Sequence, residues 1–200
     1  RAYRLALYGL LADDAQASAK AAEILAAYGQ LLDGSVPDPA FNMGVVMDNQ
    51  LRESYWVLRV AVAYDLVMAA GALDTTQAEA VRANVLDKAA DNFDLRELSN
   101  HQIWHLVGRA AVGFATGNQE MIDDVLWGSG EANDCGFYCQ IAEAFHDDGL
   151  HWERSPGYES FSLRPLLYIA HMAKVWDEDI GQHAVADGTA YDGDHGARDL

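Results

Sequence analysis

Segments with helical periodicity follow one another along most of this sequence, and that succession limits the folds the chain can adopt. The clearest lies between Gln50 and Leu73, where apolar side chains recur three and four residues apart. No segment alternates polar and apolar residues between hairpin turns, as a surface strand would. We therefore expect helices over residues 1–12, 13–32, 50–73, 76–93, 99–116, 118–127, 135–145 and 159–176.

The short connections between these helices favour an all-α fold built from antiparallel helical hairpins. A bundle, a solenoid and part of an (α/α) toroid all fit this pattern. With 200 residues, the chain is long enough for one domain with its own core. The C-terminal residues are polar and include no closing apolar element. We therefore expect residues 1–200 to be a single domain and a fragment of a longer chain.

Polar residues mark the starts of several of these helices. Ser99 and Gln102 are three residues apart, which is the spacing of a capping box, and Thr76 and Glu79 repeat it. Asn118 follows a glycine and is a suitable N-cap for the next helix. These three positions predict where three of the helices begin.

Charge and cysteine content exclude some classes of partner. The formal net charge of −18 argues against nucleic acid as a partner. No apolar run is long enough to span a bilayer, so we expect no membrane insertion. Cys135 and Cys139 are too few for a disulfide framework, and we expect two partly buried thiols on one helical face. The cysteines leave the cellular compartment open.

Asn100 and His101 fall in the first turn of the helix expected to begin at Ser99. The N-terminal end of a helix carries unpaired N–H groups and a partial positive charge, and it favours a bound anion. An amide and an imidazole at such an end suit a substrate that carries a carboxylate. Asn100 could bind the carboxylate while His101 transfers a proton, although plain capping and a surface histidine would give the same pattern.

His101 and His105 are four residues apart and share a helical face, as in the zinc-protease motif. That motif has a glutamate directly after the first histidine as its general base, and this chain has Gln102 there. We therefore expect no metal site at these residues, and we interpret His105 as a packed core histidine.

Residues 147–158 form a second polar segment, punctuated by glycine and proline. Tyr158 is either a packed anchor or a phenol that donates and accepts a proton. Trp152 could offer a face on which a sugar stacks. Glu153 and Arg154 are either a surface ion pair or a functional pair, in which Arg154 binds an anionic sugar and Glu153 orients a neighbour.

Taken together, the run Ser99–Trp104, the Ala- and Gly-rich helix that follows it, and the segment Asp148–Tyr158 resemble the heparinase II/III-like and alginate lyase group of polysaccharide lyases. The resemblance covers residues 50–175. It implies an (α/α) toroid, usually followed by antiparallel β-sheet domains, and cleavage of a uronic-acid polymer by β-elimination. It also implies a periplasmic or secreted protein that acts on an acidic polysaccharide such as alginate or a related unsulfated polyuronate.

By position, the resemblance implies a catalytic set of Asn100, His101 and Tyr158. Asn100 would bind the uronate carboxylate, His101 would be the base or its partner, and Tyr158 would be the general acid. We expect the substrate-binding residues to be Gln102, Trp152, Glu153 and Arg154. No cofactor or metal is implied, because an amide and a helix end can neutralise the carboxylate.

Two other functions fit the same residues. An α/α-toroid glycoside hydrolase would use Glu153 with Asp147 or Asp148 as its two carboxylates. A non-catalytic helical binding or scaffold module would need none of these roles.

Overall fold

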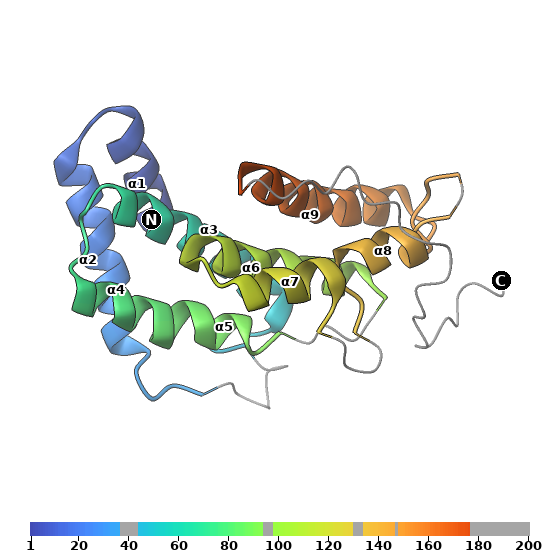
Figure 1. Ribbon diagram of the computed structural model, residues 1–200, viewed down its shortest axis with the longest axis horizontal. Helices are drawn as coiled ribbons and strands as arrows, with labels where there is room; N and C mark the ends of the chain where they lie inside the picture. The colour runs from blue at the N-terminus through green and yellow to red at the C-terminus, as the bar shows by residue number, and fades with distance from the viewer. Residues whose placement is uncertain (37–43, 94–97, 130–133, 147, 177–200) are drawn as a thin grey trace. The chain divides into compact units, whose positions relative to one another are not determined.

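The computed structural model describes residues 1–36, 44–93, 98–129, 134–146 and 148–176. These residues form helices joined by turns and one isolated bridge, without a strand, so the expected all-α class is confirmed (Figure 1). The chain divides into two compact units. The first contains residues 1–92, with 115–117 added, and the second contains 93–114 and the chain from 118 onward. No helix among the described residues has the length and apolar character needed to cross a membrane.

In the first unit, α1 (Ala2–Leu11) and α2 (Ala15–Leu31) form a tightly packed helical hairpin. Asp14 caps α2 by accepting hydrogen bonds from the backbone N–H groups of Gln16 and Ala17. Gly9 allows the close approach, because a Cβ atom there would lie 2.2 Å from the Ser18 hydroxyl oxygen. The alanine and glycine content of these helices therefore serves close helix–helix contact.

The third helix of this unit, α3 (Gln50–Ala69), packs against both α1 and α2. Its Glu53 side chain is fully buried and accepts hydrogen bonds from the backbone N–H groups of Val46 (3.2 Å) and Met47 (2.7 Å). Burial raises the pKa of Glu53, and these N–H groups partly oppose that rise. Glu53 thereby holds the turn that leads into α3.

The last helical stretch of the unit consists of α4 (Thr75–Val81), the π-helix η2 (Arg82–Asp87) and α5 (Lys88–Ala90). The expected cap at Thr76 was wrong. Asp74 is the N-cap, and it forms a capping box with Gln77. A carboxylate one residue before the first helical residue competes successfully with the hydroxyl of Thr76. The π-helical turn was not expected from the periodicity.

The second unit begins with α6 (Asn100–Thr116) and α7 (Gln119–Trp127). Both expected caps are confirmed. The Ser99 hydroxyl accepts the Gln102 backbone N–H (3.2 Å), and the Asn118 side chain accepts that of Met121 (3.2 Å). Gly113 lies against Ile122, so α6 and α7 pack closely.

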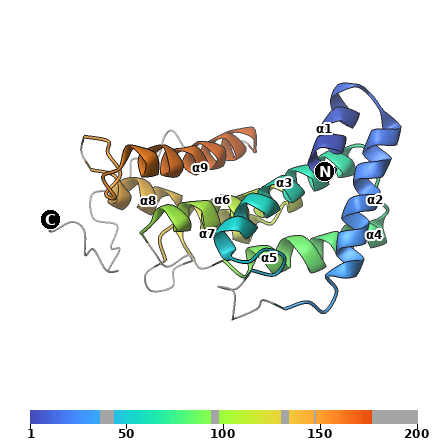
Figure 2. The same cartoon turned by 180° about the vertical axis from the view of Figure 1, so that it is seen from behind.

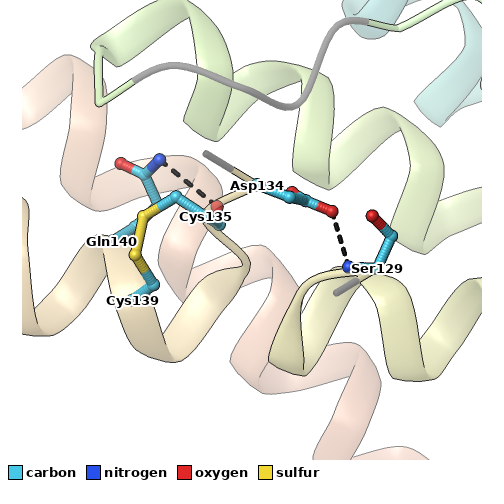
Figure 3. Close-up of a disulfide and its surroundings, with 5 residues drawn as sticks. All are labelled: Ser129, Asp134, Cys135, Cys139 and Gln140. Carbon is cyan, nitrogen blue, oxygen red and sulfur yellow. Dashed lines mark hydrogen bonds between the residues drawn. A yellow bond between two sulfur atoms is a disulfide. The ribbon is translucent and has the colours of Figure 1, made fainter. Parts of the chain in front are cut away.

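The next helix, α8, spans Phe137–Ala144, and its Cys139 forms a disulfide with Cys135 in the segment before the helix (Figure 3). The expectation of two thiols on one helical face was therefore wrong. The helix begins after Cys135 with Gly136 as its N-cap, so Cys135 lies on the preceding turn, where its sulfur reaches Cys139. The Gln140 side-chain amide donates to the Cys135 carbonyl (3.4 Å), a second link across the same turn.

The last described helix, α9, spans Pro156–Val175 and has Ser155 as its N-cap. It begins three residues earlier than expected, because proline suits the first position of a helix. Tyr158 consequently lies in the first turn of α9 and not on the preceding loop, where the sequence had placed it. Pro165 lies inside the helix.

Aromatic contacts establish the direction in which α6 and α9 run. Trp104, near the start of α6, has its ring centroid 5.4 Å from that of Phe161 and 6.4 Å from that of Tyr168. Phe114, near the end of α6, lies 6.0 Å from Trp176. The contacts advance toward the C-terminus on both helices, so the two helices are parallel. Figures 1 and 2 show this common direction from opposite sides.

Candidate active site

The parallel course of α6 and α9 brings together two segments that lie about fifty residues apart in the sequence. Asn100 and His101 are the first two residues of α6, and Tyr158 is in the first turn of α9. The loop before α9, which contains Glu153, ends at the same N-terminal end. The chemistry-bearing residues singled out from the sequence therefore gather at one end of this helix pair.

Asn100 and Glu153 make the closest polar contact at this end. The Asn100 Nδ2 atom lies 2.8 Å from Glu153 Oε1 and 2.7 Å from Oε2. Hydrogen bonds to an ionised acceptor are short and strong. Asn100 is 5% exposed, and its Oδ1 atom is buried without a hydrogen-bond partner among the described residues. The structure thus joins one expected catalytic residue to one expected substrate-binding residue.

A tight turn directs Glu153 toward Asn100. A bridge pairs Phe145 with His151, where the Trp152 backbone N–H donates to the Ala144 carbonyl (2.9 Å). The Arg154 N–H then donates to the His151 carbonyl (2.9 Å), and Arg154 adopts a positive φ of 48°. A positive φ is unfavourable for a residue with a side chain. The surrounding bonds therefore hold a locally strained turn.

His151 lies at the base of this turn and is fully buried. Its Nδ1 atom accepts the Glu153 backbone N–H (3.4 Å), and its own backbone N–H donates to Glu159 Oε2 (3.3 Å). The same Nδ1 atom lies 3.4 Å from Glu153 Oε2. Burial lowers the pKa of His151, the carboxylates of Glu153 and Glu159 oppose that change, and His146 lowers the pKa further.

His151 was not predicted from the sequence. It stands in the second polar segment, but nothing in its spacing separates a buried histidine from an exposed one. The usable signal was its place directly after the Asp148–Leu150 turn, two residues before Glu153. In the structure, the His151 ring is buried beneath the turn that contains Glu153.

Because its pKa is lowered by folding, His151 should make stability depend on pH. The unfolded chain takes up a proton near pH 6.5 and the folded chain does so only at lower pH, so stability is full above about 6.5 and falls as the pH drops below it. For each pH unit between the folded and the unfolded pKa, one such histidine lowers the free energy of unfolding by about 1.4 kcal/mol. We expect His151→Gln to flatten the decline of the thermal midpoint between pH 7 and 5, and an unchanged slope would contradict this assignment.

The other expected site residues differ in exposure. His101, Arg154 and Tyr158 are exposed, and Tyr158 is 49% accessible. Trp152 is half-buried, with its ring centroid 5.8 Å from that of His151. Gln102 is only 1% exposed, and its substrate-binding role stays a prediction.

His105 is buried and stacks on Phe93 with a centroid distance of 5.5 Å, so its interpretation as a core histidine is confirmed. Within the described residues, no cluster of three His, Cys, Asp or Glu side chains could hold a metal ion. Asp147, which the hydrolase alternative would use, lies outside the described residues.

Comparisons with known proteins find similarity to proteins named as alginate or oligoalginate lyases. The family model described as alginate lyase matches residues 13–191. A protein of Stenotrophomonas maltophilia named alginate lyase is 28% identical over 173 residues, which cover 82% of this chain and 23% of that protein. A protein of Saccharophagus degradans named exo-oligoalginate lyase is 23% identical over 126 residues, 60% of this chain and 17% of that protein. The chain thus spans less than a quarter of the length of these relatives.

Proposed function

The chain belongs to the alginate lyase family, and from that premise we propose that it carries part of the active site of a polysaccharide lyase. The reaction is a β-elimination at a uronic acid unit. A base removes the C5 proton, the electron pair forms a C4–C5 double bond, and the C4–O bond breaks. The leaving oxygen then takes up a proton.

This chemistry needs three groups near one sugar: a donor that neutralises the carboxylate, a base and an acid. Asn100 is the donor, because negative charge grows on the carboxylate as C5 loses its proton. His101 is the base or its partner, and Tyr158 protonates the leaving oxygen. Both His101 and Tyr158 are exposed.

The observation that carries the proposal is the parallel pairing of α6 and α9, because it gathers Asn100, His101 and Tyr158 at one end of the pair. Two helix N-termini at one end also contribute partial positive charge where a carboxylate would bind. Separate helix ends, or an antiparallel pair, would place Tyr158 far from Asn100.

For the substrate we propose an unsulfated polyuronate, alginate or an oligosaccharide derived from it. The carboxylates of Glu153 and Glu159 both lie at this end of the helix pair. A sulfated polyuronate would bring further negative charge toward them, and like charges repel. The printed names of the two relatives, alginate lyase and exo-oligoalginate lyase, favour the same polymer.

We propose an oxidising compartment for the protein, periplasmic or extracellular. The disulfide between Cys135 and Cys139 supports this, since such bonds form and persist outside the reducing cytosol.

The hydrolase alternative is less well supported. It needs a carboxylic acid that holds a proton for the leaving sugar. Both oxygens of Glu153 lie within hydrogen-bond distance of the Asn100 amide nitrogen, which favours an ionised carboxylate. Asp148 Oδ1 already accepts the Leu150 backbone N–H (3.1 Å).

The test is to incubate the full-length protein with alginate, polyglucuronate and heparan sulfate while ultraviolet absorbance is recorded. Elimination creates a double bond conjugated to the carboxylate, which absorbs, and hydrolysis does not. We expect absorbance to rise with alginate and stay flat with heparan sulfate. New reducing ends without absorbance would identify a hydrolase, and neither signal with any of the polymers would favour a binding module.

A further inference from the structure

Glu153 presents a difficulty for the proposed reaction. Asn100 is to neutralise a substrate carboxylate, yet its amide nitrogen already lies 2.7–2.8 Å from both oxygens of a protein carboxylate. A negative group this close to a bound uronate would repel it, so the position of Glu153 needs an explanation. The side chain of Glu153 is 18% exposed.

The geometry of the contact suggests one. An ionised carboxylate only accepts hydrogen bonds, so the Asn100 amide must turn its NH2 group, and not its oxygen, toward Glu153. Seen from the amide nitrogen, at 2.7–2.8 Å from each, the two carboxylate oxygens subtend a much smaller angle than the one between the two N–H bonds. One N–H therefore points between both oxygens as a three-centre bond, and the second N–H is left to donate elsewhere.

The structure maintains this orientation at a cost. Asn100 Oδ1 is buried without a partner among the described residues, and a buried polar atom left unsatisfied is unfavourable. On the other side, Glu153 is held by its own turn. Its backbone N–H donates to His151 Nδ1, and the strained Arg154 follows it. Glu153 thus fixes the Asn100 amide, and buried His151 in turn fixes Glu153.

We propose that Glu153 is a positioning residue, which holds the Asn100 amide so that its second N–H faces the substrate carboxylate. This inference rests on the proposed function, and of the roles considered for Glu153 it favours orienting a neighbour over contact with the sugar. Preorganised donors of this kind act when charge develops at the transition state.

The test compares Glu153→Ala with Glu153→Gln in the full-length protein. Glutamine keeps an oxygen that can accept the amide N–H, and alanine does not. We expect Glu153→Ala to lower kcat by about 10- to 100-fold, by analogy with the loss of a partner that orients a metal-binding side chain, with a smaller change in KM. Glu153→Gln should restore most of that rate. Glu120→Gln, an exposed glutamate in the first turn of α7, is the matched control.

A double variant tests whether Glu153 acts through Asn100. If Glu153 acts only through Asn100, then adding Glu153→Ala to the Asn100→Ala variant should lower kcat no further. Additive losses in the double variant would overturn the proposal, because they would mean that Glu153 acts on the substrate independently.

Crystal structures of the full-length protein and both variants give a measurement that does not need turnover. We expect the Asn100 side chain to keep its orientation with glutamine at position 153 and to lose it with alanine. An unchanged Asn100 in Glu153→Ala would overturn the inference. An equal loss of rate in the alanine and glutamine variants would also overturn it and assign the charge or a proton of Glu153 to the reaction. If the parent cleaved no polyuronate, the proposed function would fail, while the crystal structures would still decide what Glu153 does to Asn100.

Discussion

Replacing Tyr158 with phenylalanine is expected to lower the rate of polyuronate cleavage by about 10²- to 10⁴-fold, the range for loss of a general acid or base. The substitution removes one hydroxyl and keeps the aromatic ring. Because Tyr158 is half exposed in the first turn of α9, its hydroxyl supports little of the packing. The thermal midpoint should therefore stay close to that of the parent. Initial rates of ultraviolet absorbance on alginate measure the first effect, and thermal unfolding measures the second.

Tyr168→Phe is the matched control for this variant. Tyr168 lies on the same helix, is exposed to a similar degree at 43%, and contacts Trp104 through its ring. We expect it to retain full activity. If Tyr158→Phe and Tyr168→Phe behaved alike, Tyr158 would not be the acid, and a fatal Glu153→Gln would then restore the hydrolase hypothesis.

Asn100→Ala is expected to lower kcat by about 10²- to 10³-fold, the effect of removing one donor from an oxyanion-binding site. It should also destabilise the protein by about 1–3 kcal/mol, because the partly buried Glu153 carboxylate loses its amide partner. The two effects can be separated by measuring kcat well below the unfolding temperature and by recording the thermal midpoint independently.

Asn118→Ala supplies the control for the structural part. Asn118 is also an asparagine at the start of a helix, where it caps α7, and its loss should cost about 1 kcal/mol. We expect that variant to lose stability without losing kcat. A kcat for Asn100→Ala no lower than that of Asn118→Ala would remove Asn100 from the reaction.

The parts of the fold that follow from local chemistry could be predicted from the sequence. Ser99 and Asn118 cap helices where expected, because a side-chain oxygen at that position satisfies N–H groups of the first turn whatever lies around it. Asp74 displaced the expected Thr76 by two residues, because a carboxylate directly before the first helical residue competes successfully with the Thr76 hydroxyl. Helical class and family were likewise predictable.

The contacts that depend on three-dimensional placement could not be predicted. The Asn100–Glu153 pair joins residues 53 apart and needs the parallel arrangement of α6 and α9, which periodicity does not encode. The burial of His151 depends on a turn with a positive φ at Arg154, a conformation that arginine does not signal. The disulfide was missed because α8 begins two residues after Cys135, a shift within the ordinary error of a helix boundary.

The aromatic contacts between α6 and α9 have a consequence for insertions and deletions. Trp104 fixes the rotation of α6 about its own axis, since its ring is held by Phe161 and Tyr168. A single residue added between Asn100 and Trp104 would turn Asn100 by about 100° around that axis, at 3.6 residues per turn. One added beyond Phe114 would leave Asn100 facing Glu153. Within α6, the length of the chain is therefore critical only between Asn100 and Trp104, because that turn sets the direction in which Asn100 faces.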